Sequence, residues 1–104
     1  MICFDENEIG SLSADHFIAE KEDCMEQLKS RKSFDLILDC SKLLLPMTDL
    51  ETINDLQKVK ERVMVVVVST DQIDSLPMDW NAVPTQEEAF DFISFERMQR
   101  DLGF

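Results

Sequence analysis

The feature that most constrains the fold is an apolar run at residues 63 to 68, Val-Met-Val-Val-Val-Val. A strand with one face in water alternates apolar and polar side chains, whereas a strand covered on both faces is apolar throughout. This run therefore predicts a strand buried on both sides, as in the sheet of an α/β protein. Residues 34 to 40 (Phe-Asp-Leu-Ile-Leu-Asp-Cys) predict a second such strand, and a helix is expected to connect the two.

The remaining pattern predicts a single domain over residues 1 to 104, with an open, mostly parallel sheet and three helices, in the order β-α-β-α-β-β-α. An apolar strand is expected at residues 1 to 5 and a helix from about Ser13 to Ser30. Residues 48 to 51 (Thr-Asp-Leu-Glu) match a capping box, which predicts that Thr48 is the N-cap of the second helix. A short strand is expected at residues 80 to 83. A second capping box at residues 85 to 88 (Thr-Gln-Glu-Glu) then starts the last helix, which Gly103 is expected to end.

Charge and composition exclude several function classes. The chain carries 22 acidic and 10 basic residues, a net charge of −12, which argues against nucleic acid and anionic membranes as partners and suits a basic protein partner. No apolar run approaches the roughly 20 residues that span a bilayer, and the first residues are acidic where a signal peptide would be basic. We therefore expect a cytoplasmic protein.

The cysteines and the histidine predict no catalytic or metal chemistry. Cys3, Cys24 and Cys40 are widely spaced and lie in apolar elements, so buried, reduced thiols are expected. His16 is the only histidine, which excludes zinc hydrolase sites built from several histidines. We expect no enzyme activity, no metal and no cofactor.

The charges are expected to separate along the sheet. Right-handed crossovers place strand C-termini and helix N-termini at one end and helix C-termini at the other. Eight basic residues follow the expected helix ends, namely Lys29, Arg31, Lys32, Lys58, Lys60, Arg62, Arg97 and Arg100. Acidic residues are expected at the opposite end, namely Asp5, Glu6, Glu8, Asp15, Asp39, Asp49, Glu51, Asp71, Asp74, Glu87 and Glu88. Either this separation complements the helix dipoles, or it orients a partner.

Residues 34 to 70 resemble the middle of a response-regulator receiver domain, in which a strand ending in a phosphorylated Asp is followed by a helix and a strand ending in Ser or Thr. The resemblance implies Asp5 and Glu6 as Mg²⁺ ligands, Asp39 as phosphoacceptor, and Ser69 or Thr70 as the switch hydroxyl. The lysine that such domains carry before the final proline is absent from residues 81 to 84 (Asn-Ala-Val-Pro). A degenerate, Mg²⁺-binding receiver is therefore the alternative function.

A second resemblance covers residues 30 to 95. The strand at residues 36 to 41 (Leu-Ile-Leu-Asp-Cys-Ser) and the helix start at residues 85 to 89 (Thr-Gln-Glu-Glu-Ala) are similar to a small STAS domain, the fold of anti-sigma factor antagonists, and to short bacterial STAS-like proteins. The resemblance implies a non-catalytic regulatory module whose second helix begins with a hydroxyl phosphorylated by a kinase-like partner. Thr48 has that residue type. The glycine of the family motif is absent, and the resemblance implies Asp49, a permanent negative charge, at the position of the phosphorylated hydroxyl. The implied switch is therefore degenerate, with Thr48, Asp49 and Glu51 as its surface.

The last helix carries more apolar residues than one buried stripe needs. Ala89, Phe90, Ile93 and Met98 are expected to face the core. Phe92, Phe95 and Phe104 either pack with the tail or form an exposed surface for a partner or a second copy. Trp80 is expected to pack within its own loop.

Overall fold

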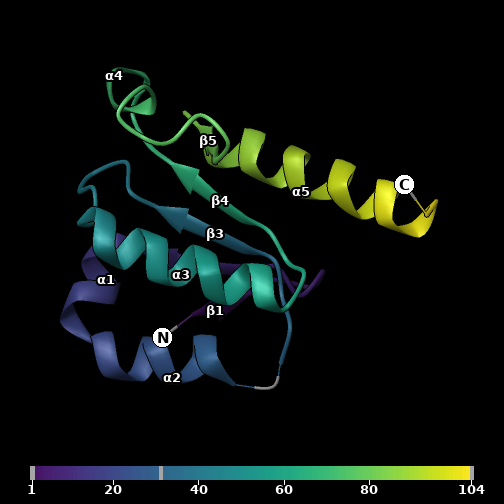
Figure 1. Cartoon of the computed structure of the whole chain (residues 1–104), viewed down its shortest axis with the longest axis horizontal. Helices are drawn as coiled ribbons and strands as arrows, with labels where there is room; N and C mark the ends of the chain where they lie inside the picture. The colour runs from purple at the N-terminus through teal and green to yellow at the C-terminus, as the bar shows by residue number, and fades with distance from the viewer. Residues whose placement is uncertain (1, 31, 104) are drawn as a thin grey trace.

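The computed structural model describes residues 2 to 30 and 32 to 103, which form a five-stranded mixed sheet with helices on both faces (Figure 1). The strands are β1 (Cys3–Phe4), β2 (Gly10–Ser13), β3 (Leu36–Asp39), β4 (Met64–Val67) and β5 (Asn81–Val83), and they lie side by side in chain order. The helices are α1 (Ala14–Ala19), α2 (Lys21–Lys29), α3 (Met47–Val59), α4 (Thr70–Ile73) and α5 (Gln86–Asp101). β1 pairs antiparallel with β2, and the other three pairings are parallel. The α/β class and the mostly parallel sheet are confirmed.

The central strands are buried on both faces, as their apolar sequences predicted. Leu36, Leu38 and Val66 point to one face, where they join the core residues of α1, α2 and α3. Ile37, Val65 and Val67 point to the other face and pack against α5, whose Ala89 and Ile93 are fully buried. Each buried Leu, Ile or Val contributes about 1.5–3 kcal/mol relative to exposure, so the two layers together hold the sheet.

The N-terminal hairpin is a correction to the predicted element order. Strand β2 was not expected, because Gly-Ser-Leu-Ser has no β-branched or aromatic residue. The turn that makes it is built by Asp5, whose Oδ1 accepts the backbone N–H groups of Asn7 and Ile9, both at 2.9 Å. Glu8 completes the turn with a left-handed backbone, φ 61°. A short polar strand is thus set by turn chemistry rather than by strand propensity.

Two further helices were not expected. The helix predicted from Ser13 to Ser30 is divided at Glu20 (φ −132°, ψ 49°) into α1 and α2, although residues 19 to 21 contain no helix-breaking residue. Ser13 does start it as predicted, since its Oγ accepts the N–H of His16 at 3.2 Å. The single-turn helix α4 lies in a segment expected to be a loop.

The ends of α5 follow the prediction. Thr85 is its N-cap, and its Oγ1 accepts the N–H of Glu88 at 3.2 Å. Gly103 follows the helix with φ 81°, the left-handed conformation that favours glycine after a C-cap. Met98, however, was expected in the core and is 60 % exposed. Phe104 lies outside the described residues.

The cysteines are unbridged. Cys24 and Cys40 are fully buried as expected, and burial raises the pKa of both thiols. Cys3 was expected to be buried and is exposed, because β1 is an edge strand and Cys3 points to the sheet face beyond the cover of α5. In the described part of the chain no helix has the length and apolarity needed to cross a membrane.

A buried ion cluster joins the last helix to the beginning of β3. The Asp35 side chain is 1 % exposed, and its carboxylate accepts hydrogen bonds from Arg97 Nε (3.0 Å) and from Arg100 Nη2 (2.9 and 3.0 Å). The backbone N–H of Val63 donates a further bond to Oδ1 at 3.1 Å. Burial acts to raise the pKa of Asp35, but these bonds outweigh it and hold that pKa below its usual value.

Candidate interaction site at the carboxyl end of the sheet

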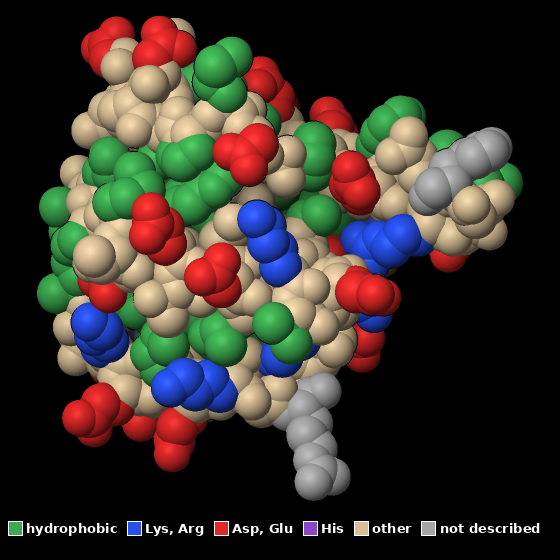
Figure 2. Space-filling model, in the orientation of Figure 1, with side chains coloured by type: hydrophobic (Ala, Val, Ile, Leu, Met, Phe, Trp, Pro, Cys, Tyr) green, Lys and Arg blue, Asp and Glu red, His purple; other side chains and the backbone are tan. Residues whose placement is uncertain are grey.

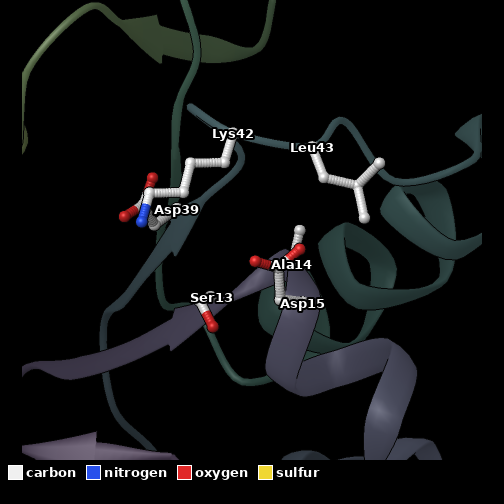
Figure 3. A pocket seen from close by; sticks show the side chains of 6 residues that line it. All are labelled: Ser13, Ala14, Asp15, Asp39, Lys42 and Leu43. Carbon is white, nitrogen blue, oxygen red and sulfur yellow. The ribbon is translucent and has the colours of Figure 1, made fainter.

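The carboxyl end of the sheet, where β2 to β5 finish, is the end at which open α/β sheets most often bind ligands. Ser13 of β2 and Asp39 of β3 are register partners there. They line a shallow hollow of about 150 Å³ with Ala14, Asp15, Lys42 and Leu43. Figure 3 shows the Lys42 side chain extending toward the Asp39 carboxylate, with Asp15 and Leu43 on the other side of the hollow. The hollow is thus polar, with one cation and two carboxylates.

Asp39 is held in place by its neighbours. Its Oδ1 accepts the Ser41 hydroxyl at 2.6 Å and the Ser41 backbone N–H at 3.0 Å, and its Oδ2 accepts Gln86 Nε2 at 3.1 Å. Burial raises the pKa of this carboxyl, but the bonds from Ser41 and Gln86, helped by the charge of Lys42, lower it more, so the pKa falls below its usual value. Asp39 is therefore a fixed anion that ties β3 to the start of α5.

A second hollow adjoins Asp39 on the sheet face next to the first turn of α5. It has a volume of about 240 Å³ and is lined by Cys3, Ser11, Leu12, Ser13, His16, Ile37, Asp39 and Gln86. The His16 ring nitrogen Nε2 lies 3.0 Å from Glu20 Oε2, across one turn of helix. Within residues 2 to 30 and 32 to 103, no group of three or more Cys, His, Asp or Glu side chains is arranged to hold a metal ion.

The predicted phosphorylation surface is at this end, but Thr48 does not cap the helix. Pro46 is the N-cap of α3, and its carbonyl accepts the N–H groups of Asp49 and Leu50 at 3.0 and 3.1 Å. The helix starts earlier than predicted because Leu45 and Leu50, before and after its first turn, are both buried in the same core cluster, as in a hydrophobic staple. Thr48 is left exposed in the first turn.

The acidic neighbours of Thr48 differ in their surroundings. Asp49 pairs with Lys21 of α2 at 3.0 Å, and its side chain is only 20 % exposed. Glu51 is exposed to solvent. Asp49 therefore serves to join α2 and α3, in an ion pair of the partly exposed kind that contributes about 0–1 kcal/mol.

The carboxylates named by the receiver resemblance are not brought together. Because β1 runs antiparallel to β2, Asp5 and Glu6 lie near Gly10, where β2 begins, whereas Asp39 lies where β3 ends. The same geometry corrects the expected acidic end, since Asp5, Glu6 and Glu8 lie at the opposite end of the sheet. Ser69 and Thr70 do follow β4 at the carboxyl end, where both are exposed.

The aromatic residues predicted to form an oligomer surface are only partly exposed. Phe92 is half-buried and packs on the α5 side of the core, whereas Phe95 is 57 % exposed. Phe95 shares an exposed stripe of α5 with Met98 and Leu102, which are 60 % and 65 % exposed. A dimer through Phe92, Phe95 and Phe104 stays a prediction, which sedimentation at high concentration tests.

An apolar hollow beside the edge strand β5, here called the β5 hollow, was not expected from the sequence. It has a volume of about 490 Å³ and is lined by Ile73, Asp74, Leu76, Pro77, Met78, Trp80 and Ala82. Trp80 was expected to pack within its own loop, and the structure packs it, partly buried, against the main core cluster, while Met78 is fully exposed. On the face that Figure 2 shows, hydrophobic side chains also gather between α4 and α3, where Figure 1 places the loop from β3 to α3, with acidic side chains around them. The signal was present in the sequence, as apolar residues at 76, 77, 78 and 80 of an otherwise polar segment.

Comparisons with known proteins add no assignment. No family model matches the chain, and neither a curated protein nor a solved structure matches it.

Proposed function

We propose that this protein is a non-catalytic, cytoplasmic regulatory module that binds a protein segment bearing both basic and apolar side chains. The observation that carries the proposal is the β5 hollow, an apolar surface whose lining includes one carboxylate. The segment from Ser69 to Pro84 that forms it contains three acidic residues and no basic one. An apolar recess with an acidic rim favours an amphipathic, basic ligand over an acidic one.

The chain's charge also favours a different protein over a second copy as occupant. Two copies, each with a net charge of −12, repel each other, whereas a basic segment is attracted and its encounter is accelerated. The resemblance to anti-sigma factor antagonists supports the same class of function. In that proposal Thr48, exposed on the first turn of α3, is the hydroxyl open to a kinase-like partner, with Asp49 and Glu51 beside it. An intact mass without added phosphate, after incubation with the native kinase, removes the switch but leaves the binding module.

Trp80 allows a direct test, because it is the only tryptophan of the chain and lines the β5 hollow. A tryptophan-free helical peptide of Lys and Leu is titrated into the protein while Trp80 emission is followed. We expect a saturable change that weakens with added salt, and a much smaller change with a Glu and Leu peptide of the same length.

Two variants distinguish peptide binding in the β5 hollow from nonspecific hydrophobic contact elsewhere on the surface. Met78 and Val59 are both strongly exposed, at 102 % and 84 %, but only Met78 lines the hollow. Met78→Glu is expected to weaken peptide binding at least fivefold, while Val59→Glu, with the same change of charge, leaves it within twofold. Equal weakening by the two substitutions would refute the β5 hollow as the binding surface.

A further inference from the structure

The amino end of the sheet, where β3 and β4 begin, contains a concentration of arginine. Arg62, Arg97 and Arg100 are the three arginines that the structure describes, and all three line one polar hollow of about 230 Å³. The other residues of its lining are Asn7, Glu8, Ser33, Phe34 and Asp35. Three guanidinium groups against two carboxylates make this hollow locally positive in a chain whose net charge is −12.

The guanidinium groups of Arg97 and Arg100 are fixed before any ligand arrives. Asp35 accepts Nε of Arg97 and Nη2 of Arg100, and the Asn7 carbonyl accepts Nη1 of Arg97 at 2.7 Å. These bonds use two of the three nitrogens of Arg97 and one of Arg100. Each group therefore keeps N–H donors beyond those bonds, at side chains that are 34 % and 32 % exposed.

Arg62 is not required by this ion cluster. Its side chain makes one hydrogen bond, from Nη1 to the backbone carbonyl of Glu61 at 3.3 Å, and no ion pair with any residue that the structure describes. Its backbone is held at the end of α3, where its N–H donates to the Gln57 carbonyl at 2.9 Å. Its position at the end of α3 complements the helix dipole, and its guanidinium, with no carboxylate partner among the described residues, keeps most of its donors for a ligand.

We propose that Arg62, Arg97 and Arg100 form a binding site for a phosphoryl group. Guanidinium donors match phosphate oxygens in geometry, and donors converging from different segments suit a tetrahedral anion better than a planar carboxylate. Asp35 orients two of the three groups and neutralises one charge, which leaves a cationic cradle with little ordering cost on binding. The site is assembled from segments far apart in the sequence, because the second half of α5 lies at the end of the sheet where β3 and β4 begin (Figure 1).

The test is a titration of the full chain with inorganic phosphate at constant ionic strength, followed by NMR of the arginine Nε–Hε signals. We expect saturable shifts of the signals of Arg62, Arg97 and Arg100, and weaker shifts with acetate or chloride. Phenyl phosphate distinguishes the source of the ligand: tighter binding indicates a phosphate monoester, and equal binding indicates free phosphate.

Variants of Arg62 then distinguish a phosphate-binding site from arginines that only stabilise the fold. Arg62→Gln is expected to weaken phosphate binding about fivefold or more. Arg62→Lys should weaken it less, because lysine keeps the positive charge but lacks the paired N–H donors of the guanidinium group. Lys42→Gln removes the same charge at the opposite end of the sheet and is expected to leave phosphate binding unchanged. An unchanged far-ultraviolet spectrum verifies that Arg62→Gln is folded. Shifts that do not saturate, or binding equal in Arg62→Gln and the unmodified chain, would refute the site and leave Arg97 and Arg100 as a structural clamp on Asp35.

Discussion

Asp35 and Arg100 are 65 positions apart in the sequence, and the carboxylate of one accepts two hydrogen bonds from the same guanidinium nitrogen of the other. The pair fastens the second half of α5 to the sheet, beyond the last fully buried residue of that helix, Ile93. From the sequence, Arg100 was expected only to be one of the basic residues at one end of the sheet. An isolated acid in an apolar strand sequence was the available sign that a cation had to be nearby.

Replacing Asp35 with Asn is expected to destabilise the fold by about 2–3 kcal/mol, because two arginines lose their shared carboxylate. The loss is below that of a fully buried pair, since both arginine side chains remain about one-third exposed. Urea unfolding measures it. Asp55→Asn, on the exposed side of α3, is the matched control and should cost less than about 0.5 kcal/mol.

The same substitution should change how stability depends on pH. The pKa of Asp35 is lower in the folded chain than in the unfolded chain, so its contribution is complete above the unfolded pKa, near 4. It is lost as the pH falls from there through the folded value. The stability difference between the unmodified chain and Asp35→Asn should therefore shrink below about pH 4 and stay constant from pH 6 to 8. A difference that persists undiminished at low pH would mean that the Asp35 charge is not what stabilises the chain.

Gly10 is expected to tolerate no side chain. A Cβ at this position would lie 2.9 Å from Ile2 Cγ2 and 3.0 Å from Phe34 Cδ2, both in a packed core. Gly10→Ala should destabilise the protein by about 1–3 kcal/mol, measured by thermal or urea unfolding. Ser11, the next residue of β2, is only half-buried, so Ser11→Ala should change the stability little.

The backbone conformation of Glu61 is one that glycine adopts more easily. It follows the last turn of α3 with φ 57°, and its N–H and that of Arg62 donate to Lys58 and Gln57 carbonyls, as in a Schellman motif. Glu61→Gly is expected to stabilise the chain by about 0.5–1 kcal/mol by removing the left-handed strain. Glu51→Gly removes the same charge within α3 and should instead cost about 1 kcal/mol. Two losses of stability would contradict the assigned helix end.

Thr85 and Thr48 should respond differently to alanine. Thr85→Ala removes a side-chain cap and should cost about 1 kcal/mol, whereas Thr48→Ala should change stability by less than about 0.5 kcal/mol. Calorimetric measurement of the unfolding free energy of the two variants tests this difference. A large cost at Thr48 would restore the capping box that the sequence predicted there.

These two threonines also show what the sequence could reveal. Both stand in the same local motif, and what separates them is tertiary: Leu45 must be buried beside Leu50, so α3 begins at Pro46. The apolar strands could be predicted, because every residue of β4 is apolar, which is the pattern of a strand buried on both faces. The hairpin and the arginine hollow could not, because a turn built by the Asp5 side chain and contacts across more than 60 positions leave no local pattern.

The order of the strands has a consequence for how the chain folds. Every strand pairs with the strand just before it in sequence, so the sheet can assemble progressively from the N-terminal hairpin as synthesis proceeds. Helix α5 follows all five strands in the sequence, and until it docks one apolar face of β3 and β4 remains open to water, with Asp35 uncompensated at its edge. The closing of Arg97 and Arg100 onto Asp35 therefore requires residues that follow every strand, and in a chain stalled before residue 97 this apolar face is expected to stay open to aggregation.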